Sequence, residues 1–433
     1  MKKVGFLVKE LGLAMKKPPP LKNDCFALPQ GTNWTPVDDA LERLKSVSKC
    51  LVETEKLSAK DAIGRILATN IHAGYSSPPH ANSAVDGYAV NSKDLKKSGL
   101  ISLTILPGRA AAGHPFSGEI TEGDALPIYT GAKMPIGADT VILQEDTVSE
   151  NSKVSFYGPI KPGSNTRDLG EDVEENTLIL PKGRRITPGD IALMASTGVS
   201  SITVYSRLKV GIFSTGDEVI NSDVDPSAGQ VFDANRPLLY SLLDEWGFDV
   251  IDFGILRDNR KHIETELAKA CGKVDVIITS GGASAGQEDH MSAILTKNDS
   301  LAVWRIAVKP GRPLILAVYN GKPVFGLPGN PVAAGTCAMV FAKPALNVFS
   351  GSNWLEPLSF ELPANFSKSK KAGRREFLRA RIRNGKVDIF KSEGSGRISG
   401  LSWAEGFVDL PEHELSVMPG ENVKYIPFSS YTD

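Results

Sequence analysis

The fold class follows from the stretch Leu208-Lys209-Val210-Gly211-Ile212-Phe213-Ser214-Thr215-Gly216-Asp217-Glu218, an apolar run of strand length that ends in hydroxyls, glycine and acids. Downstream, similar apolar runs alternate with amphipathic segments. One of these segments, 235–246, has apolar residues at 238, 239, 242, 243 and 246, which form one helical face, and Gly247 follows as a stop. Such alternation is typical of βαβ units, so we expect an α/β domain built on a parallel sheet.

The remainder of the chain indicates further domains. Thr35-Pro36-Val37-Asp38-Asp39 combines an N-cap residue, a proline at the first helical position and early acids, which predicts a helix through Leu44. Short strand-like pieces broken by glycine and proline fill 73–177 and return after 356. The predicted fold is therefore multidomain, α/β plus β. Its parts are an N-terminal extension (1–34), an α/β domain (37–56 and 207–355), a small mixed linker domain (57–72 and 178–206), a β-rich domain (73–177) and a C-terminal β-barrel (356–433).

Composition excludes several classes of protein. The 433 residues are 41% hydrophobic and 23% charged, as in soluble globular proteins, and the net charge of -1 gives no field that would attract nucleic acid or an anionic membrane. The four cysteines form no CxxC pair, so neither a zinc site nor a disulfide framework is expected, and a cytoplasmic setting fits. Lys9 and Glu10 interrupt the N-terminal apolar run, and no run reaches the length of a membrane span.

Polar and glycine-rich loops follow the predicted strands of the α/β domain. In open α/β sheets, ligands bind outside the carboxyl ends of the strands. Glycine amides can approach an anion closely, so this rim suits a phosphate-bearing ligand. Neither a dinucleotide fingerprint nor a P-loop is present, which disfavours a dehydrogenase or an NTPase. The acids Glu218, Asp258 and Asp289 either cap helices or hold a hard cation such as Mg²⁺. The loops are 214–218, 257–258, 280–286 with Asp289, 309–313 and 326–331.

A second candidate site lies in the stretch from Pro79 to Val90. Asn82 and Ser83 can make turn hydrogen bonds to the backbone, and Gly87 permits a positive φ. Asp86 has no basic residue within several positions on either side, so nothing nearby in the sequence neutralises it. The alternative is an ordinary strand-entry turn with a capping aspartate.

The segment Ser83-Ala84-Val85-Asp86-Gly87-Tyr88-Ala89 resembles the SAMDGYA signature of the molybdopterin molybdenumtransferase family. The resemblance extends over about 37–430. It implies an elongated four-domain homodimer whose active site lies between the α/β domain of one subunit and the β-rich domain of the other. The implied substrates are molybdopterin adenylate and molybdate, AMP is released, and a molybdopterin adenylyltransferase is a further partner; the expected cofactor is the Mg²⁺ that the rim acids suggest. The other matching segments are 64–68, 130–132, 134–135, 137–139, 170–172, 213–218, 280–286 and 326–332.

The resemblance and the charge of the substrates together assign site residues. Asp86, Thr130, Asp172 and Glu218 are expected to be catalytic, and Asp258 and Asp289 to bind the metal. Lys309 is expected at the open edge of the sheet, where its ammonium would meet the anionic substrates. The expected substrate-binding residues are Ser280, Gly281, Gly282, Ser284, Gly286, Arg305, Lys309, Gly329, Asn330, Pro331, Arg374 and Ser395.

Three residues depart from the family pattern. Ala81 replaces an aspartate, Arg305 replaces a lysine, and His290 replaces an aromatic residue. These departures leave open a catalytically weak protein that binds or carries molybdopterin. A nicotinamide oxidoreductase is a third possibility, but it lacks its glycine fingerprint.

Overall fold

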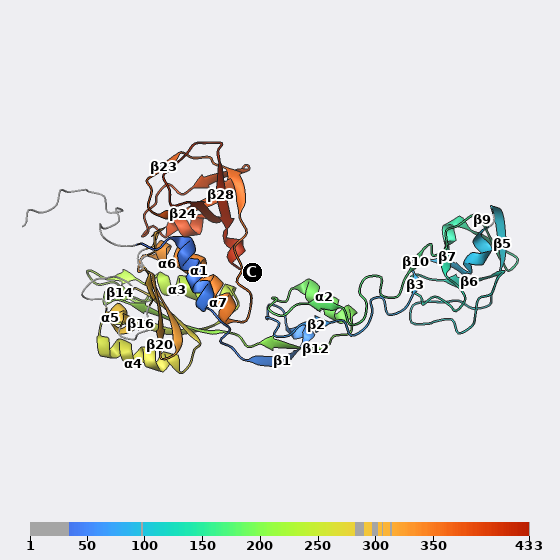
Figure 1. Cartoon of the computed structure of the whole chain (residues 1–433), viewed down its shortest axis with the longest axis horizontal. Helices are drawn as coiled ribbons and strands as arrows, with labels where there is room; N and C mark the ends of the chain where they lie inside the picture. The colour runs from blue at the N-terminus through green and yellow to red at the C-terminus, as the bar shows by residue number, and fades with distance from the viewer. Residues whose placement is uncertain are drawn as a thin grey trace, which may run out of the picture. The chain divides into compact units, whose positions relative to one another are not determined.

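The computed structural model describes residues 34–96, 98–281, 290–296, 302–304, 306–311 and 314–432. Apart from Trp34, the predicted N-terminal extension therefore lies outside the described residues. The fold is multidomain with several separate sheets, as the sequence predicted (Figure 1). The domain boundaries given above remain predictions.

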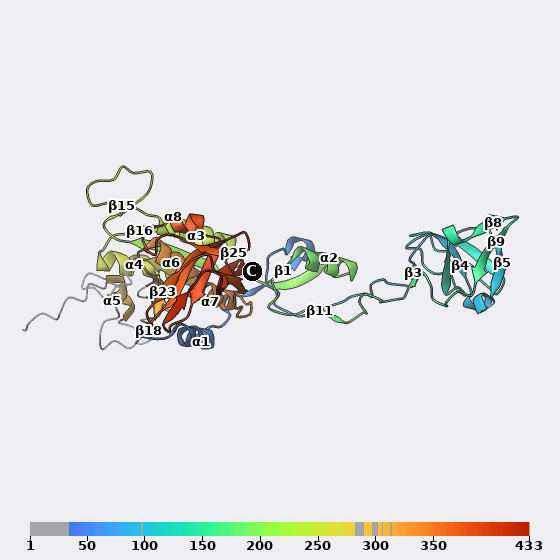
Figure 2. The same cartoon turned by 90° about the horizontal axis from the view of Figure 1, so that it is seen from above.

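The α/β domain is built on a six-stranded sheet in the order β16-β13-β17-β21-β20-β18. Successive side chains of β13 pack into two different apolar clusters, one on each face of the sheet. Val210 and Ile212 belong to a cluster that includes residues of α1, α3, α6 and α7. Phe213 belongs to a cluster that includes residues of α4 and α5 (Figures 1 and 2). Helices therefore cover both faces of the sheet. The elements are α1 (Val37–Val47), β13 (Lys209–Thr215), β14 (Val219–Ile220), β15 (Val231–Phe232), α3 (Asn235–Glu245), β16 (Asp249–Leu256), α4 (Arg260–Cys271), β17 (Val276–Ser280), α5 (His290–Thr296), β18 (Ala302–Trp304), β20 (Leu314–Tyr319), β21 (Lys322–Leu327), α6 (Pro331–Cys337), the π-helix Ala338–Ala342 and α7 (Lys343–Phe349).

The sheet is not wholly parallel, contrary to the prediction. β16, β13, β17 and β21 run parallel, but β20 is antiparallel to both of its neighbours. The cause is a two-residue hairpin between β20 and β21, in which Asn320 and Gly321 have φ values of +48° and +77°. Asn-Gly is the strongest short-range hairpin signal, and the βαβ interpretation overlooked it.

One expectation about α1 is also wrong. The N-cap is Pro36 rather than Thr35, and the helix runs to Val47, beyond the predicted end. Thr35 instead forms a parallel bridge with Ile306, and its carbonyl accepts a hydrogen bond from the Ala307 N–H at 2.9 Å. Because this bridge keeps the backbone extended at Thr35, Pro36 takes the N-cap position and the helix begins at Val37.

The longest apolar helical segment, Pro331–Phe349, spans α6, the π-helix and α7. Among the described residues it is the one helix long and apolar enough to cross a membrane, with a mean hydropathy of 1.4, and its apolar window is 89% buried inside the protein. The sequence analysis found no such span because Thr336, Lys343 and Asn347 interrupt the apolar run. Within the core, the Lys343 Nζ donates to Asn347 Oδ1 at 2.8 Å, so these two polar side chains form a hydrogen bond with each other inside the protein.

The β-rich segment contains a six-stranded sheet in the order β7-β4-β6-β5-β9-β8. Two apolar clusters form around this sheet, since Ala89 belongs to one and its neighbour Val90 to the other. The strands are β3 (Asn82–Ser83), β4 (Gly87–Val90), β5 (Gly99–Ile105), β6 (Asp124–Ile128), β7 (Thr140–Leu143), β8 (Val148–Glu150), β9 (Lys153–Gly158) and β10 (Thr166–Arg167), with 3-10 turns at Ser92–Lys96 and Gln144–Asp146.

Two strand pairs and one helix form the small mixed segment. Thr187 caps α2 through a capping box, in which its side chain accepts from the Asp190 N–H and the Asp190 carboxylate accepts from the Thr187 N–H. Both strand pairs are antiparallel, β1 with β12 and β2 with β11. The elements are β1 (Thr54–Ser58), the 3-10 turn Ala59–Asp61, β2 (Ile71–His72), β11 (Leu178–Leu180), α2 (Pro188–Ser196) and β12 (Ser201–Tyr205).

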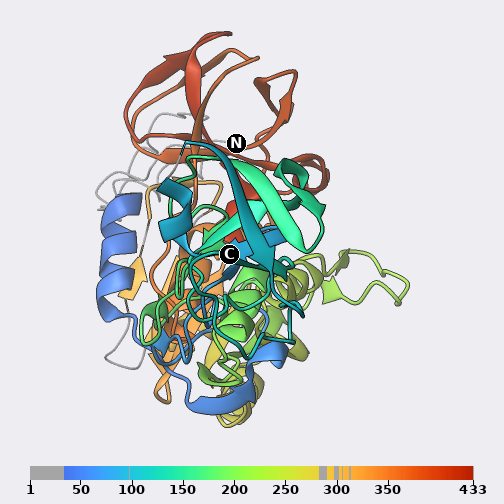
Figure 3. The ribbon, with the colours of Figure 1, turned by 90° about the vertical axis from the view of Figure 1, so that its right-hand side faces the viewer.

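The C-terminal strands curl into a barrel. β25, β24, β26, β28 and β22 pair in succession, and a bridge between Ala364 and Val387 joins the last strand region back to the first (Figure 3). β19 (Val308–Lys309), which precedes β20 in the chain, pairs in parallel with β24 and so extends this sheet rather than the α/β sheet. The elements are β22 (Phe360–Pro363), β23 (Lys368–Lys370), β24 (Arg375–Arg383), β25 (Lys386–Ile389), α8 (Ser399–Trp403), β26 (Gly406–Leu410), β27 (Leu415–Val417), β28 (Asn422–Pro427) and the 3-10 turn Phe428–Tyr431.

Candidate functional site

Of the loops predicted to form one rim, the described parts of those after β13, β17 and β21 lie at one edge of the α/β sheet. In the parallel register, Ser214 is paired with Ser280 and Ser280 with Leu327, so the loops after β13, β17 and β21 begin side by side. Because β20 is reversed and Ile315 pairs with Gly326, the segment before β20 reaches the same edge.

A compact hydrogen-bonded cradle forms the centre of this rim. The Asn235 Nδ2 donates to Ser280 Oγ and to the Gly329 carbonyl, both at 2.6 Å, and thereby joins three loops. Ser280 is 2% exposed. Gly281 has a φ of +84°, and a Cβ there would lie 2.8 Å from the Thr215 carbonyl oxygen, so the position requires glycine.

Sequence reasoning missed Asn235, which it treated only as part of a helical face. The residue is 8% exposed and occupies the first position of α3. The available signal was a polar amide at a helix start that faces the rim. Its Oδ1 is buried with no hydrogen-bond partner among the described residues, which leaves an unsatisfied acceptor on a residue of the cradle.

Acidic side chains gather beside the cradle. The Asp258 N–H donates to Asp217 Oδ1 at 3.1 Å, and the Arg257 guanidinium donates to the Asp217 carbonyl at 2.7 Å. The pKa of Asp258 is raised by burial and by the negative charges of Asp217 and Glu218, while the backbone hydrogen bond to Asp217 and the charge of His290 act in the opposite direction. Mutual repulsion among these carboxylates is what a bound cation would relieve.

The predicted metal site is only partly described. Among the described residues, no group of three or more His, Cys, Asp or Glu side chains is close enough to hold a metal ion. Asp258 is present beside other acids, but Asp289 lies outside the described residues. The same holds for the predicted substrate-binding residues Gly282, Ser284, Gly286 and Arg305.

The C-terminal barrel contributes a loop to the start of α6. The Val332 N–H donates to the Ser395 carbonyl at 3.2 Å, and Asn330 is the N-cap of this helix, with Pro331 at its first position. The predicted binding residues Ser395, Asn330 and Pro331 are therefore neighbours. Arg374 immediately precedes β24 and is partly exposed.

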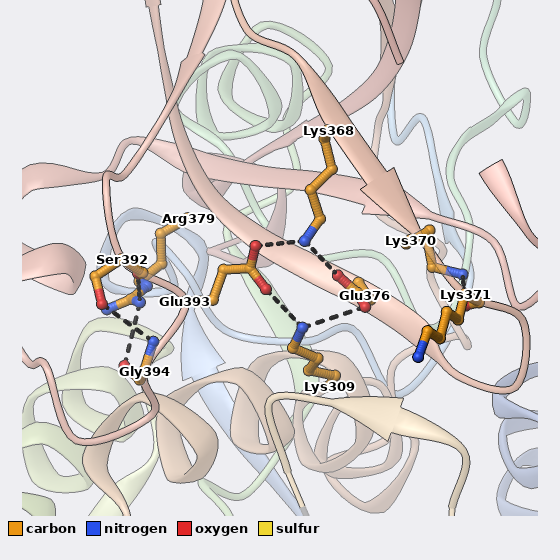
Figure 4. Close-up of polar contacts among 9 residues, drawn as sticks. All are labelled: Lys309, Lys368, Lys370, Lys371, Glu376, Arg379, Ser392, Glu393 and Gly394. Carbon is orange, nitrogen blue, oxygen red and sulfur yellow. Dashed lines mark hydrogen bonds and ion pairs between the residues drawn. The ribbon is translucent and has the colours of Figure 1, made fainter. Parts of the chain in front are cut away.

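Lys309 does not lie at an open edge, contrary to the prediction. Its side chain is 13% exposed, and its Nζ lies 3.2 Å from Glu376 Oε1 and 2.6 Å from Glu393 Oε2 (Figure 4). The reason is that β19 pairs with β24 in the barrel sheet, which turns Lys309 toward barrel carboxylates. Lys368 pairs with the same two glutamates, so we call Lys309, Lys368, Glu376 and Glu393 the ionic quartet.

The second candidate site is a well-anchored loop in the β-rich segment. The Asp86 carboxylate accepts hydrogen bonds from the N–H and the hydroxyl of Thr130, both at 2.7 Å, so two predicted catalytic residues are in contact. These two hydrogen bonds lower the pKa of Asp86, which remains exposed. Asp86 is therefore ionised and oriented.

The surrounding loop supports this arrangement with one difference from the prediction. Ser83 makes the expected turn hydrogen bond, since its hydroxyl donates to the Val85 carbonyl at 2.5 Å. Gly87 does not need a positive φ; a Cβ there would lie 1.9 Å from the Ile142 carbonyl oxygen, so close approach of β7 requires the glycine. The Asp172 N–H donates to the Ser77 carbonyl at 3.0 Å. The Ala81 carbonyl accepts from the Met134 N–H at 2.9 Å.

Comparison with known proteins covers almost the whole described fold. Family models match at 35–198 (MoeA N-terminal region, domains I and II), 211–348 (probable molybdopterin binding domain) and 361–428 (MoeA C-terminal region, domain IV). A molybdopterin molybdenumtransferase of Haemophilus influenzae is 34% identical over 400 residues, which are 91% of this chain and 98% of the relative. The chain belongs to the molybdopterin molybdenumtransferase (MoeA) family.

Other members of the MoeA family agree in sequence and structure. A molybdopterin molybdenumtransferase of Nostoc is 31% identical over 86% of this chain and 88% of its own length. The crystal structure of a molybdopterin biosynthesis MoeA protein from Pyrococcus horikoshii superposes with a TM-score of 0.80 at 29% identity, covering 92% of this chain and all of that one. The rim cradle lies inside the matched molybdopterin binding domain, and Asp86 lies inside the matched N-terminal region.

Proposed function

We propose that this chain acts in molybdenum cofactor biosynthesis, where it inserts molybdenum from molybdate into adenylylated molybdopterin and releases AMP. The observation that carries the proposal is the cradle of Asn235, Ser280 and Gly329 within the matched molybdopterin binding domain. Its glycine-rich backbone can approach a pyrophosphate, and the start of α6 favours negative charge.

The catalytic step is cleavage of the pyrophosphate that joins AMP to molybdopterin. Asp86 accepts a proton from an attacking water, the water oxygen bonds to phosphorus, and the phosphorus–oxygen bond to the AMP phosphate breaks. Thr130 supports this role because its two hydrogen bonds keep the Asp86 carboxylate ionised and fixed in orientation. Asp172 is the third proposed catalytic residue of this segment, as the family resemblance implies.

We infer that Mg²⁺ assists this step. When bound, it would neutralise part of the charge of the pyrophosphate. Asp258 would hold it together with Asp289, the two residues predicted from the sequence, and the raised pKa of Asp258, which burial and the neighbouring acids cause, fits a place where positive charge is needed.

We further propose a cytoplasmic homodimer with composite sites, in which Asp86 of one subunit serves the rim of the other. Mixing an Asp86→Asn chain with a Glu218→Gln chain should then restore part of the activity, because each heterodimer contains one site in which both acids are intact. No recovery after demonstrated subunit exchange would place both acids in one chain's site. Capture of a molybdopterin adenylyltransferase by the dimer would test the remaining proposed partner.

The decisive experiment measures AMP released from molybdopterin adenylate by the purified chain with molybdate and Mg²⁺. Asp86→Asn should be slower by about a hundredfold, the scale of a lost acid or base. Asp124→Asn is a matched control, since Asp124 accepts from the N–H and hydroxyl of Thr121 at 3.3 and 2.6 Å in the same domain. It should turn over like the parent.

Two outcomes would contradict this scheme. Equal rates for Asp86→Asn and the parent chain would make Asp86 a turn residue. Tight binding of the adenylate by the parent chain without AMP release would favour the carrier protein over the transferase.

A further inference from the structure

The loop that carries Glu218 continues into a short arm of the α/β domain. This arm consists of β14 and β15 with the loop 221–230 between them (Figure 2). Each strand has two residues, and the two strands form a parallel sheet of their own. An isolated two-stranded ladder is marginally stable in water, so the position of Glu218 depends on what else holds the arm.

The Glu218 carboxylate takes its position from the backbone that carries it. It is exposed, and among the residues that the structure describes no hydrogen bond or ion pair holds it, whereas Asp86 accepts two hydrogen bonds from Thr130. The carboxylate lies against Gly216, because a Cβ added at Gly216 would lie 2.6 Å from Glu218 Oε2. The Gly216 N–H donates to the Leu256 carbonyl at the end of β16, at 3.2 Å, so this contact lies at the rim.

The backbone at Glu218 is held by β15, and β15 is held by α3. The Val231 N–H donates to the Glu218 carbonyl at 2.8 Å. Asp233 follows β15 directly and is 8% exposed. Its Oδ1 accepts from the N–H groups of Asn235 and Arg236, each at 3.1 Å. Since both N–H groups belong to the first turn of α3, the end of the arm is fixed to the start of this helix.

The Arg236 guanidinium connects both strands of the arm to the main sheet. Its Nε donates to Asp233 Oδ2 at 3.1 Å, after β15, and its Nη2 donates to Asn221 Oδ1, after β14. Its Nη1 pairs with Asp252 Oδ2 on β16 at 2.5 Å, and the Arg236 side chain is 17% exposed. A guanidinium presents its donors in a rigid planar fork, so one side chain fixes three separate segments.

We propose that Arg236 is a positioning residue for Glu218: through Asp233 and Asn221 it fixes the arm and so holds the Glu218 carboxylate against Gly216 at the rim. The inference rests on the proposed function, because the family resemblance assigns Glu218 to catalysis. It explains how an exposed carboxylate without a hydrogen bond of its own among the described residues keeps one orientation.

The first test measures AMP release from molybdopterin adenylate by the full chain. Arg236→Met keeps the aliphatic stem and removes the guanidinium, so kcat should fall at least about tenfold while KM stays within about twofold. In a Glu218→Gln chain, the same substitution should lower the residual kcat by less than about twofold, because the carboxylate that Arg236 positions is already gone. Arg236→Lys keeps the charge without the fork and should lose activity as Arg236→Met does.

Amide hydrogen exchange gives a readout that needs no turnover. The Val231 N–H should exchange at least about tenfold faster in Arg236→Met than in the parent chain, because the arm then opens locally. The amides of the β20–β21 hairpin should exchange as in the parent chain. Arg65→Met is the matched control, since the Arg65 side chain is 12% exposed and pairs with Glu55 in the small mixed segment. It should change neither kcat nor exchange at Val231.

The outcomes separate this inference from the proposed function. A fall in kcat of equal size in the parent and Glu218→Gln backgrounds would overturn the inference, because Arg236 would then act independently of Glu218. Unchanged exchange at Val231 would overturn it even if the parent chain releases AMP. Faster exchange confined to the arm would support it even if the parent chain shows no turnover, a result that would contradict the proposed function alone. Should Arg236→Met fail to fold, Asn221→Ala must speed exchange at Val231, and no change there would overturn the inference.

Discussion

Replacement of Lys309 by alanine tests the position that the tertiary structure gives this residue. At an open sheet edge the substitution would hardly affect stability. In the ionic quartet it leaves Glu376, 10% exposed, and Glu393 with only Lys368 as a cationic partner within the quartet. Removing one partner of a buried ion pair costs about 3–5 kcal/mol, and we expect about 3 kcal/mol here because Lys368 remains beside both carboxylates.

Thermal melting of the purified variant measures this cost. A loss of about 3 kcal/mol should lower the apparent melting temperature by about 6–12 °C at roughly 2–4 °C per kcal/mol. Lys93→Ala is the control, since Lys93 pairs with Glu122 at 3.2 Å with both side chains more than half exposed, at 68% and 61%, and its loss should shift stability by less than about 0.5 kcal/mol.

A double variant separates charge from packing. Adding Glu376→Gln to Lys309→Ala removes the carboxylate that lost its partner, so part of the stability should return. If Lys309→Ala melts like the parent chain, the quartet does not stabilise the junction of β19 with the barrel, and the reasoning from burial fails. Molybdate affinity of the same variant should fall by about 1–3 kcal/mol, the range for a lost charge-assisted hydrogen bond.

Two further predictions concern the rim. The pKa of Asp258 is raised by burial and by neighbouring acids, so the ionised form of Asp258 destabilises the folded state at pH values above the unfolded pKa. Asp258→Asn should therefore have a higher melting temperature than the parent chain at neutral pH. This difference should vanish as acidification protonates Asp258. Mg²⁺ should raise the melting temperature of the parent more than that of Asp258→Asn, and equal shifts would remove Asp258 from the metal site. Gly281→Ala should lose molybdopterin binding because its Cβ would lie 2.8 Å from the Thr215 carbonyl oxygen. Gly321→Ala is the control: residue 321 has a φ of +77° and an added Cβ would have no atom within 4 Å, so this variant should lose only about 1–2 kcal/mol of stability. Similar molybdopterin binding by both variants would contradict the cradle geometry.

The sequence by itself determined the elements and much of the site. Periodicity placed the strand β13 and the helix α3 to within a few residues, because their apolar pattern matches their burial. Local chemistry also singled out Asp86 and the glycine-rich loop with Gly281 as candidates, since a loop that approaches a ligand needs small residues and an oriented acid, whereas Thr130 came from the resemblance to the family.

Only the tertiary structure decided how these elements pair and which charges meet. The position of β13 between β16 and β17 depends on crossover connections that no local sequence pattern specifies. The contact of Asp86 with Thr130 joins residues 44 positions apart, and the burial of Lys309 against Glu376 joins residues 67 positions apart. Periodicity reports which face of an element is buried, but not which element covers it. For that reason the sequence led us to expect Lys309 at the open edge of the α/β sheet, whereas its ammonium pairs with Glu376 and Glu393 of the barrel.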